Sequence, residues 1–487
     1  MHQLKDCGVS PLSSEAHVFP KTSEFDEAKS SRMIPLIKVI ESRVEQSGPQ
    51  SQEFVYVDIG CIDRETKRIV DPKLLPLSKA PSRAKQLLKT GDVLVSMTRP
   101  NLNAVAIVPP DLDGSIGSTG FHVLRARDAE PAFLFYAVQS NEFIDAMCLK
   151  VQGALYPAVR PRDISSFCIP PLSLAQQRRI VAEIEKQFTR LEAGVSALKR
   201  VQANLKRYRA AVLKAACEGK LVPTEAELQK AGGRGQKAKA AYETGAALLA
   251  RILAERRKNW QGRGKYKEPV APDTAKLPPL PEGWAWASVE QLAAHDPNSI
   301  TDGPFGSNLK TAHYMDSGPR VIRLQNIGDG VYIDEEAHIT QAHFERLQKH
   351  RIFAGDVVIA GFGENPPRSC IIPESLGPAI VKADCIRFKT NNSVLPKYMN
   401  NALNSEPVRK RTKGMVHGVG RPRLNLGEIK SIILPIPPLA EQTRIVAEVE
   451  RRLSVVEELE ATVSANLQRA TRLRQAVLQR AFTGELV

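Results

Sequence analysis

Cysteine is scarce in this sequence, and the positions of the cysteines argue against two common ways of cross-linking a fold. The seven cysteines are scattered along 487 residues, and no two of them stand in a CxxC arrangement. Neither a disulfide framework nor a zinc knuckle is therefore indicated. The nine histidines form no HExxH pair, so no metal site is predicted. We expect reduced, mostly buried thiols.

Long apolar runs are also missing. No stretch approaches the ~20 apolar residues that span a bilayer, and the start MHQLKDCGVS lacks the basic-then-apolar pattern of a signal peptide. We therefore expect a cytoplasmic protein. Lys and Arg together exceed Asp and Glu by 15, and a basic surplus of this size favours a polyanionic partner. Nucleic acid is the better candidate, because nothing in the chain resembles a membrane segment.

Motifs for catalysis on DNA are absent as well. No GxxxxGK[ST] occurs, which excludes a P-loop ATPase. The segment 361–368, GFGENPPR, approaches the Asn-Pro-Pro-aromatic motif of amino-methyltransferases, but Arg368 stands where the aromatic ring would stack on a flipped base. No glycine-rich strand-turn-helix for S-adenosylmethionine accompanies it. We interpret 361–368 as a proline-ordered surface loop near DNA, and we predict that the chain is not an enzyme.

An internal repeat organises the chain. Residues 175–222 align without a gap with residues 440–487, and both segments share the run RIVAE and the ending Gly-x-Leu-Val. Upstream, Gly91-Asp92-Val93-Leu94 matches Gly355-Asp356-Val357-Val358, and Arg160-Pro161-Arg162 matches Arg421-Pro422-Arg423. Each copy is therefore a variable block followed by a closely repeated one, which indicates a tandem duplication.

The repeated blocks predict two long helices. Apolar residues recur every seven positions in both copies, as they do in a coiled coil. Proline pairs precede each helix, and Gly219 and Gly484 provide the stops. Some 40 residues make a rod of roughly 60 Å, longer than the preceding domain is wide, so its apolar seam needs a partner and the other copy is the obvious one. The predicted pairing residues are Ile184, Leu191, Leu198, Leu205, Val212, Val449, Val456, Val463 and Val477.

The variable blocks alternate short apolar strands, such as 54–57 and 357–360, with turn residues and a helix or two. We predict an α+β fold for them. The basic, proline-punctuated stretch 223–279 is predicted to be a linker with one helical run near 246–257, and residues 1–30 a loose leader.

Basic loops are the remaining candidates for function. The second copy crowds Lys and Arg into a glycine-rich segment, where backbone can approach a phosphate closely, and the first copy has a sparser counterpart. A solvated charged loop is the usual explanation for one such run, but its recurrence in both copies favours DNA contact. The candidate DNA-binding residues are Lys150, Tyr156, Arg160, Arg162, Lys310, Arg409, Lys410, Arg411, Lys413, His417, Arg421 and Arg423.

Together these features resemble the specificity subunit of type I restriction-modification systems. The likeness is carried by the prolines before AQQRRIV and AEQTRIV, the Gly-x-Leu-Val endings, the segment 277–286 that opens the second half, and the loop DGPFGS at 302–307. It covers nearly the whole chain from about residue 31. The first block lacks a match to the 302–307 loop and to the tryptophan-containing opening.

The resemblance implies two target-recognition domains, at 31–172 and 280–438, each reading half of a split, asymmetric DNA site. It implies that spacer helices at 173–222 and 439–487 form an antiparallel pair that sets the gap, and that two methyltransferase subunits and later restriction subunits bind this scaffold. Adenine methylation and ATP-driven cleavage would belong to those partners, which bring S-adenosylmethionine, ATP and Mg; no cofactor is expected in this chain. A stand-alone DNA-modifying enzyme and a coiled-coil scaffold or regulator stay open as alternatives.

Overall fold

The computed structural model describes residues 33–153, 157–231, 242–260, 264–363, 365–418, 420 and 422–486. The chain forms two compact units. Unit 1 comprises Met1–Leu198 with Ala465–Val487, and unit 2 comprises Lys199–Ser464. Both units mix helix and sheet, as the pattern of short apolar strands, turns and helices predicted, and we describe each by itself.

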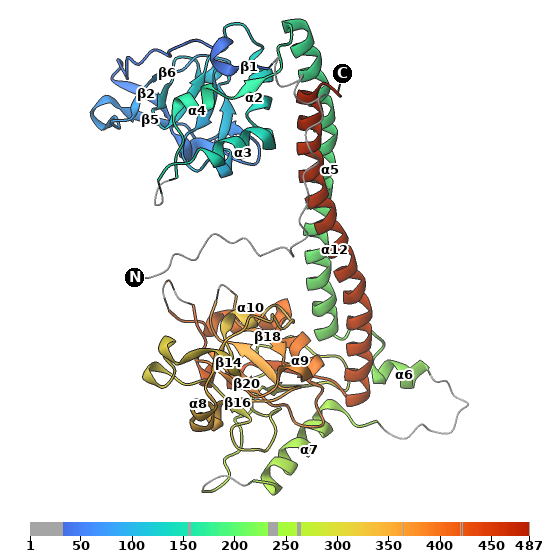
Figure 1. The fold of residues 1–487 in the computed structure, drawn as a ribbon. Helices are drawn as coiled ribbons and strands as arrows, with labels where there is room; N and C mark the ends of the chain where they lie inside the picture. Colours follow the sequence, from blue (N-terminus) through green and yellow to red (C-terminus); the bar gives the residue numbers. More distant parts are fainter. Residues whose placement is uncertain are drawn as a thin grey trace, which may run out of the picture. The chain divides into compact units, whose positions relative to one another are not determined.

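Unit 1 contains small sheets covered by short helices. A three-stranded antiparallel sheet has the order β10-β7-β8, and a four-stranded sheet has the order β5-β2-β9-β6, in which β2 and β9 run parallel. Helix α2 lies between these sheets and the long helix α5 (Leu174–Cys217) (Figure 1). The strands are β1 (Ile34–Pro35), β2 (Glu53–Val57), β3 (Ile62–Asp63), β4 (Arg68–Ile69), β5 (Lys73–Pro76), β6 (Ala84–Leu87), β7 (Val93–Ser96), β8 (Val105–Ile107), β9 (Ile116–Ser118), β10 (Phe121–Leu124) and β11 (Cys168–Ile169); the short helices are α2 (Pro131–Ala137), α3 (Asn141–Leu149) and α4 (Pro161–Ser165).

Unit 2 has its own sheets of similar order. One four-stranded sheet runs β13-β20-β17-β18, and the other runs β15-β14-β19-β16 with β14 parallel to β19. The strands are β12 (Ala285–Ser288), β13 (Ile300–Thr301), β14 (Tyr314–Ile322), β15 (His338–Ile339), β16 (Arg351–Ile352), β17 (Val357–Ala360), β18 (Arg368–Ile371), β19 (Ala379–Val381), β20 (Cys385–Phe388) and β21 (Ile433–Ile436); the helices before the last long one are α6 (Glu225–Ala231), α7 (Gly245–Lys258), α8 (Gln341–Arg346), α9 (Pro396–Leu403), α10 (Glu406–Thr412) and α11 (Leu426–Ser431).

The two units repeat one topology. The order β10-β7-β8 of unit 1 returns as β20-β17-β18 in unit 2, and β5-β2-β9-β6 returns as β15-β14-β19-β16 with the parallel pair in the same place. Two short helices follow in each, with proline at the first turn of α2 and of α9, where its missing N–H costs nothing. The duplication seen in the sequence therefore extends through the variable blocks, where side-chain identity is low.

Each copy of the repeat ends in a long helix. Helix α5 spans Leu174–Cys217 and α12 spans Leu439–Thr483. Gly219 and Gly484 follow them with φ of +65° and +82°, the left-handed conformation that ends many helices. The two predicted helices and their glycine stops are confirmed.

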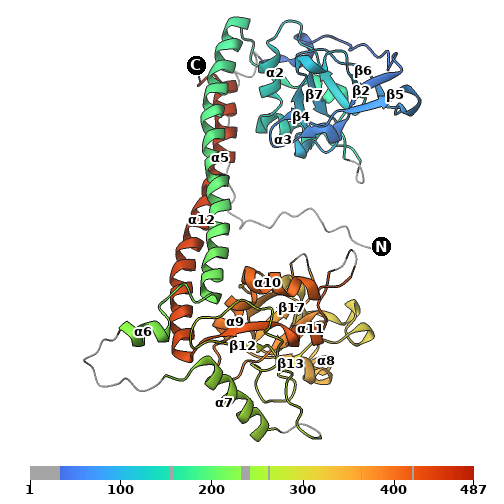
Figure 2. The same ribbon diagram turned by 180° about the vertical axis from the view of Figure 1, so that it is seen from behind.

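Each unit contains the beginning of one long helix and the end of the other. In unit 1 a single apolar core joins Ile184 and Phe188 of α5 to Leu478 and Ala481 of α12. In unit 2 the core joins Val212 and Leu213 of α5 to Val446 and Val449 of α12, among others. The early residues of one helix thus pack against late residues of the other, so the helices run antiparallel within each unit (Figures 1 and 2).

The linker contributes to unit 2. Helix α7 buries Leu248 and Ile252 in the unit 2 core, and its N-cap Thr244 accepts a hydrogen bond from the Ala247 N–H. The predicted helical run near 246–257 is therefore confirmed as α7. Within the described residues no helix is long and apolar enough to cross a membrane.

Candidate nucleic-acid interface

Two loops of unit 1 are hydrogen-bonded to each other beyond the three-stranded sheet. The Arg99 N–H donates to the Pro157 carbonyl at 2.8 Å, and the Val159 N–H donates to the Met97 carbonyl at 2.8 Å. The second loop is closed on itself by Ala158, which exchanges two backbone hydrogen bonds with Gln152 at 2.9 and 3.1 Å. Since buried backbone groups need partners, these bonds fix where both loops begin.

Unit 2 repeats this arrangement bond for bond. The Gly363 N–H donates to the Pro422 carbonyl at 3.3 Å, and the Leu424 N–H donates to the Gly361 carbonyl at 2.7 Å. His417 and Arg423 exchange the two backbone hydrogen bonds that close the second loop, at 3.0 and 3.2 Å. The surface loop predicted at 361–368 therefore lies beside the basic segment that the sequence analysis singled out separately.

These bonds correct one alignment made from the sequence. Arg160-Pro161-Arg162 was matched with Arg421-Pro422-Arg423, but Ala158 is the structural counterpart of Arg423. Arg160 instead precedes α4 and its N–H donates to Asp163 at 2.9 Å, as the N–H of Asn425 donates to Glu428 before α11. The shared Arg-Pro-Arg letters misled the alignment because the helix start, which sets the register, falls at Arg160 in unit 1 but at Asn425, after the second Arg-Pro-Arg, in unit 2.

A third loop of unit 2, residues 302–310, reaches the same region. His350 Nδ1 lies 2.5 Å from the Asp302 carbonyl, and His343 Nε2 lies 2.8 Å from the Asn308 carbonyl. Gly303 passes so close to Lys382 that a Cβ would lie 2.0 Å from its carbonyl carbon, so only glycine fits there. The turn after Lys382 accepts the Gly361 N–H at the Asp384 carbonyl, which connects this third loop to the other two.

Most predicted DNA contacts in unit 1 are exposed. Lys150 follows α3 and its Nζ lies 3.1 Å from Ser166 Oγ at the end of α4, close to Arg160 and Arg162, whose side chains are also exposed. Three residues from two segments are therefore brought to one surface around α4. Tyr156 lies outside the described residues.

The predicted DNA contacts of unit 2 differ in how exposed they are. Lys310, Lys410 and Lys413 are exposed. His417 is half exposed, with Nδ1 3.1 Å from a Glu428 carboxylate oxygen. Arg421 lies outside the described residues.

Two further predicted contacts are engaged by other groups of unit 2. The Arg409 guanidinium donates to Asp329 at 2.7 Å, to Asn404 at 3.0 Å and to the Pro367 carbonyl at 3.1 Å. Arg411 lies with its guanidinium carbon 4.9 Å from the centre of the Trp286 ring, and burial lowers its pKa. Both arginines hold α10 to the rest of unit 2, which sequence composition alone could not distinguish from DNA contact.

Arg423 is partly engaged within unit 2 and partly exposed. One guanidinium nitrogen lies 2.7 Å from Asp384 Oδ1, and the side chain keeps 42% of its surface exposed. The counterparts in unit 1 are Ala158 and Gly120, since the Met97 N–H donates to the Gly120 carbonyl as that of Gly361 donates to Asp384. The ion pair is therefore special to unit 2, and a guanidinium edge remains for an outside acceptor.

The sequence analysis missed a pair of buried glutamines that join each domain to its helix. Gln177 accepts the Glu130 N–H at 2.8 Å before α2 and donates to the Leu172 carbonyl at 2.8 Å. Gln442 does the same in unit 2, with the Leu395 N–H and the Pro437 carbonyl at 3.0 Å each. Both glutamines belong to the repeated block, so their identity in the two copies was the available signal.

The predicted pairing residues of the helices lie mostly inside. Ile184, Leu205, Val212, Val449, Val456 and Val463 are buried, and Leu191, Leu198 and Val477 are half-buried. A seam of this kind requires an apolar partner along its length.

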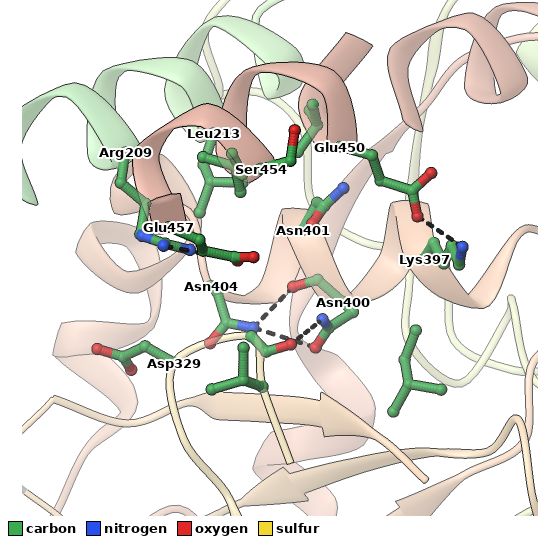
Figure 3. A pocket seen from close by; sticks show the side chains of 15 residues that line it. Arg209, Leu213, Asp329, Lys397, Asn400, Asn401, Asn404, Glu450, Ser454 and Glu457 are labelled. Atoms are coloured by element: carbon green, nitrogen blue, oxygen red, sulfur yellow. Dashed lines mark hydrogen bonds and ion pairs between the residues drawn. The ribbon is translucent and has the colours of Figure 1, made fainter. Parts of the chain in front are cut away.

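A cleft of about 370 Å³ lies where α9 meets the paired helices of unit 2 (Figure 3). Its polar side chains face one another: Lys397 pairs with Glu450 at 2.5 Å, and the Asn404 amide donates to the Asn400 carbonyl at 2.8 Å. The Lys397–Glu450 pair joins α9 to α12 across this cleft. The described residues contain no group of His, Cys, Asp or Glu suited to a metal ion.

The comparisons with known proteins agree with this organisation. Residues 328–469 match the family model described as type I restriction modification DNA specificity domain. The chain is 25% identical over 360 residues to the specificity subunit of the type I restriction enzyme EcoDI of Escherichia coli, covering 73% of this chain and 70% of that protein. It is 21% identical over 355 residues to the EcoBI specificity subunit, covering 73% and 65%.

A solved structure is similar over nearly the whole chain. It comes from a study of complex assembly and conformational transition in a type I restriction-modification system, and it aligns with a TM-score of 0.62 and 26% identity over 93% of this chain and 98% of that one. The similarity covers both units and both long helices.

Proposed function

Because this chain belongs to the specificity subunits of type I restriction-modification systems, we propose that its two domains read the two halves of a split, asymmetric DNA target. The domain at 31–172 would read one half-site and the domain at 280–438 the other. The observation that carries this proposal is the same pair of hydrogen-bonded loops in both units. Two similar folds with different loop side chains suit two different half-sites.

DNA contact is assigned to the basic residues that keep exposed groups. In unit 1 these are Lys150, Arg160 and Arg162, with Tyr156 retained from the sequence. In unit 2 they are Lys310, Lys410, Lys413, His417 and Arg423, with Arg421 retained from the sequence. Lysine and arginine contacts to phosphate position a protein on the duplex, and contacts to base edges give specificity.

The long helices would act as spacer and scaffold. An antiparallel pair of 44 and 45 residues would set how far apart the two half-sites lie. Two methyltransferase subunits, and restriction subunits after them, would bind this scaffold. Adenine methylation and ATP-driven cleavage would reside in those partners, which would supply S-adenosylmethionine, Mg and ATP, and the complex would work in the cytoplasm.

The test is the methylated motif in DNA from cells that express this chain with its methyltransferase partner. We expect methylated adenines in two short sequences separated by a fixed, unspecified gap, and no such methylation when the gene for this chain is deleted. Methylation of one uninterrupted motif would contradict the split target. Methylation that persists without this chain would contradict its role in recognition.

A further inference from the structure

One loop has the same length and the same anchoring in both units, although its sequence differs. It leaves the end of β7 or β17 and returns as β8 or β18, covering 97–104 in unit 1 and 361–368 in unit 2. At its start the N–H of Arg99 and that of Gly363 bind the carbonyls of Pro157 and Pro422.

The end of this loop also lies at equivalent positions in the two units. The Ser96 N–H donates to the Ala104 carbonyl at 3.0 Å, and Ala360 is paired with Arg368 across β17 and β18. Ala104 and Arg368 are therefore counterparts, just as Arg99 and Gly363 are.

The two copies exchange which of these positions carries arginine. Unit 1 has Arg99 at the start of the loop and alanine at its end, whereas unit 2 has glycine at the start and Arg368 at its end. A side chain at Gly363 would begin 3.7 Å from Nη2 and 3.8 Å from Nε of Arg368. The Arg368 guanidinium thus occupies the space beside position 363, and each unit places a guanidinium group at the same part of the loop.

The backbone favours a fixed presentation of this group. Arg99 has φ of +47°, a left-handed conformation that costs a non-glycine residue on the order of 1 kcal/mol and persists where the surroundings impose it. Within the described residues, the guanidinium groups of Arg99 and Arg368 have neither a hydrogen bond nor an ion pair with another side chain. Both loops also carry an exposed asparagine at the same position, Asn101 and Asn365.

We propose that Arg99 and Arg368 are equivalent DNA-contacting residues, one for each half-site. A guanidinium group binds guanine O6 and N7 or phosphate oxygens, often through two parallel hydrogen bonds. The exchange of positions maintains this donor in both units while allowing the rest of the loop to differ. The inference rests on the proposed function, because it requires that both units read DNA.

The experiment measures binding of the chain, assembled with its methyltransferase partner, to duplexes that carry its methylated motif or single base-pair changes in it. Arg99→Asn keeps a residue that tolerates the left-handed backbone, and Arg368→Gln keeps a polar side chain. Arg99→Lys and Arg368→Lys retain the charge and remove the planar fork. The controls are Arg127→Gln in unit 1 and Arg257→Gln in unit 2, whose guanidinium groups pair with Asp128 and Glu268.

We expect Arg99→Asn and Arg368→Gln to weaken binding roughly 5- to 150-fold each, through opposite half-sites, while the controls bind like the parent. If a variant loses its preference at one base pair and the matching lysine variant does not restore that preference, the arginine contacts that base pair. If a variant binds all duplexes equally more weakly and the lysine variant largely restores the affinity, the arginine contacts phosphate. Unchanged affinity and base-pair preference in both variants, with unchanged thermal unfolding, would overturn the proposal, as would an effect of both on one half-site.

The failure of the proposed function gives a different result. In that case the parent complex itself would show no preference for a split motif. If the parent prefers the split motif and both variants match it, only the role of Arg99 and Arg368 is refuted.

Discussion

The guanidinium of Arg209 lies 3.7 Å from the Glu457 carboxylate in unit 2, and its counterpart Arg474 lies 3.3 Å from Glu192 in unit 1. The four residues are two positions of the repeated block, so each arginine of one copy pairs with the glutamate of the other. Both glutamates are well exposed, and such pairs contribute only about 0.2–1 kcal/mol. They report the antiparallel register, which the buried apolar seam stabilises.

The junction between domain and helix should depend on Gln442. Replacing Gln442 with Ala leaves the Leu395 N–H without its partner, and an unsatisfied buried donor costs about 1–3 kcal/mol. We therefore expect Gln442→Ala to lower the urea midpoint of unit 2. Gln229→Ala, at an exposed position of α6 in unit 2, is the matched control. Equal midpoints for both variants would show that the junction does not depend on this amide.

Unit 1 should lose stability in mild acid through His122. Burial lowers the pKa of His122 from 6.5 to about 4, so the unfolded chain binds a proton that the folded one rejects. The contribution of this histidine is fully present above pH 6.5 and falls as the pH is lowered toward 4, by on the order of 3 kcal/mol. We expect His122→Gln to flatten this part of the pH profile of unfolding, with Ser165 Oγ, now 2.8 Å away, still able to hydrogen-bond. Parallel profiles for variant and parent would contradict the prediction.

DNA binding should weaken steeply with salt, because lysine and arginine contacts to phosphate release counterions. Lys410, in α10, and Lys413, directly after it, are exposed. If both contact phosphate, replacing them with Ala should reduce the slope of log affinity against log salt by about 2. The measurement is a salt titration of the complex with its target duplex, and Lys349→Ala with Lys258→Ala is the control. A slope equal to that of the parent would show that these lysines do not contact phosphate.

The helices should act as a ruler. Inserting one whole heptad into α5 and one into α12, at the level where Arg209 meets Glu457, keeps the apolar seam in register and adds ~10 Å to the rod. We expect the preferred gap between half-sites to grow by about three base pairs, at ~3.4 Å each, with both half-site sequences unchanged. Some affinity should be lost, because three base pairs turn the duplex by roughly a third of a turn.

Methylation of a target library with varied gaps, by the lengthened chain and its partner, measures this preference. An insertion of three residues in each helix is the control, because it breaks the seam and should abolish modification. A folded, active seven-residue variant with the original gap would refute the ruler and leave the helices as docking surfaces.

The linear sequence was sufficient for the duplication, the long helices and their ends. Heptad spacing, prolines before residue 174 and before residue 439, and glycines at 219 and 484 act within a few residues of chain, so they can be read without knowing the fold. The repeated block, the segment 277–286 and the loop at 302–307 likewise carried the family resemblance.

Tertiary structure alone decided which arginines remain available. Arg409 and Arg411 belong to the same basic run as Lys410, yet their guanidinium groups are held by Asp329 and Trp286. Residues two apart point to opposite sides of a helix, so the two arginines meet different neighbours of α10, while Lys410 is exposed. The equivalence of Arg99 and Arg368 was hidden for a related reason. Two different chain positions can deliver a guanidinium group to one place, and only the hydrogen bonds between loops distant in sequence show that the place is the same.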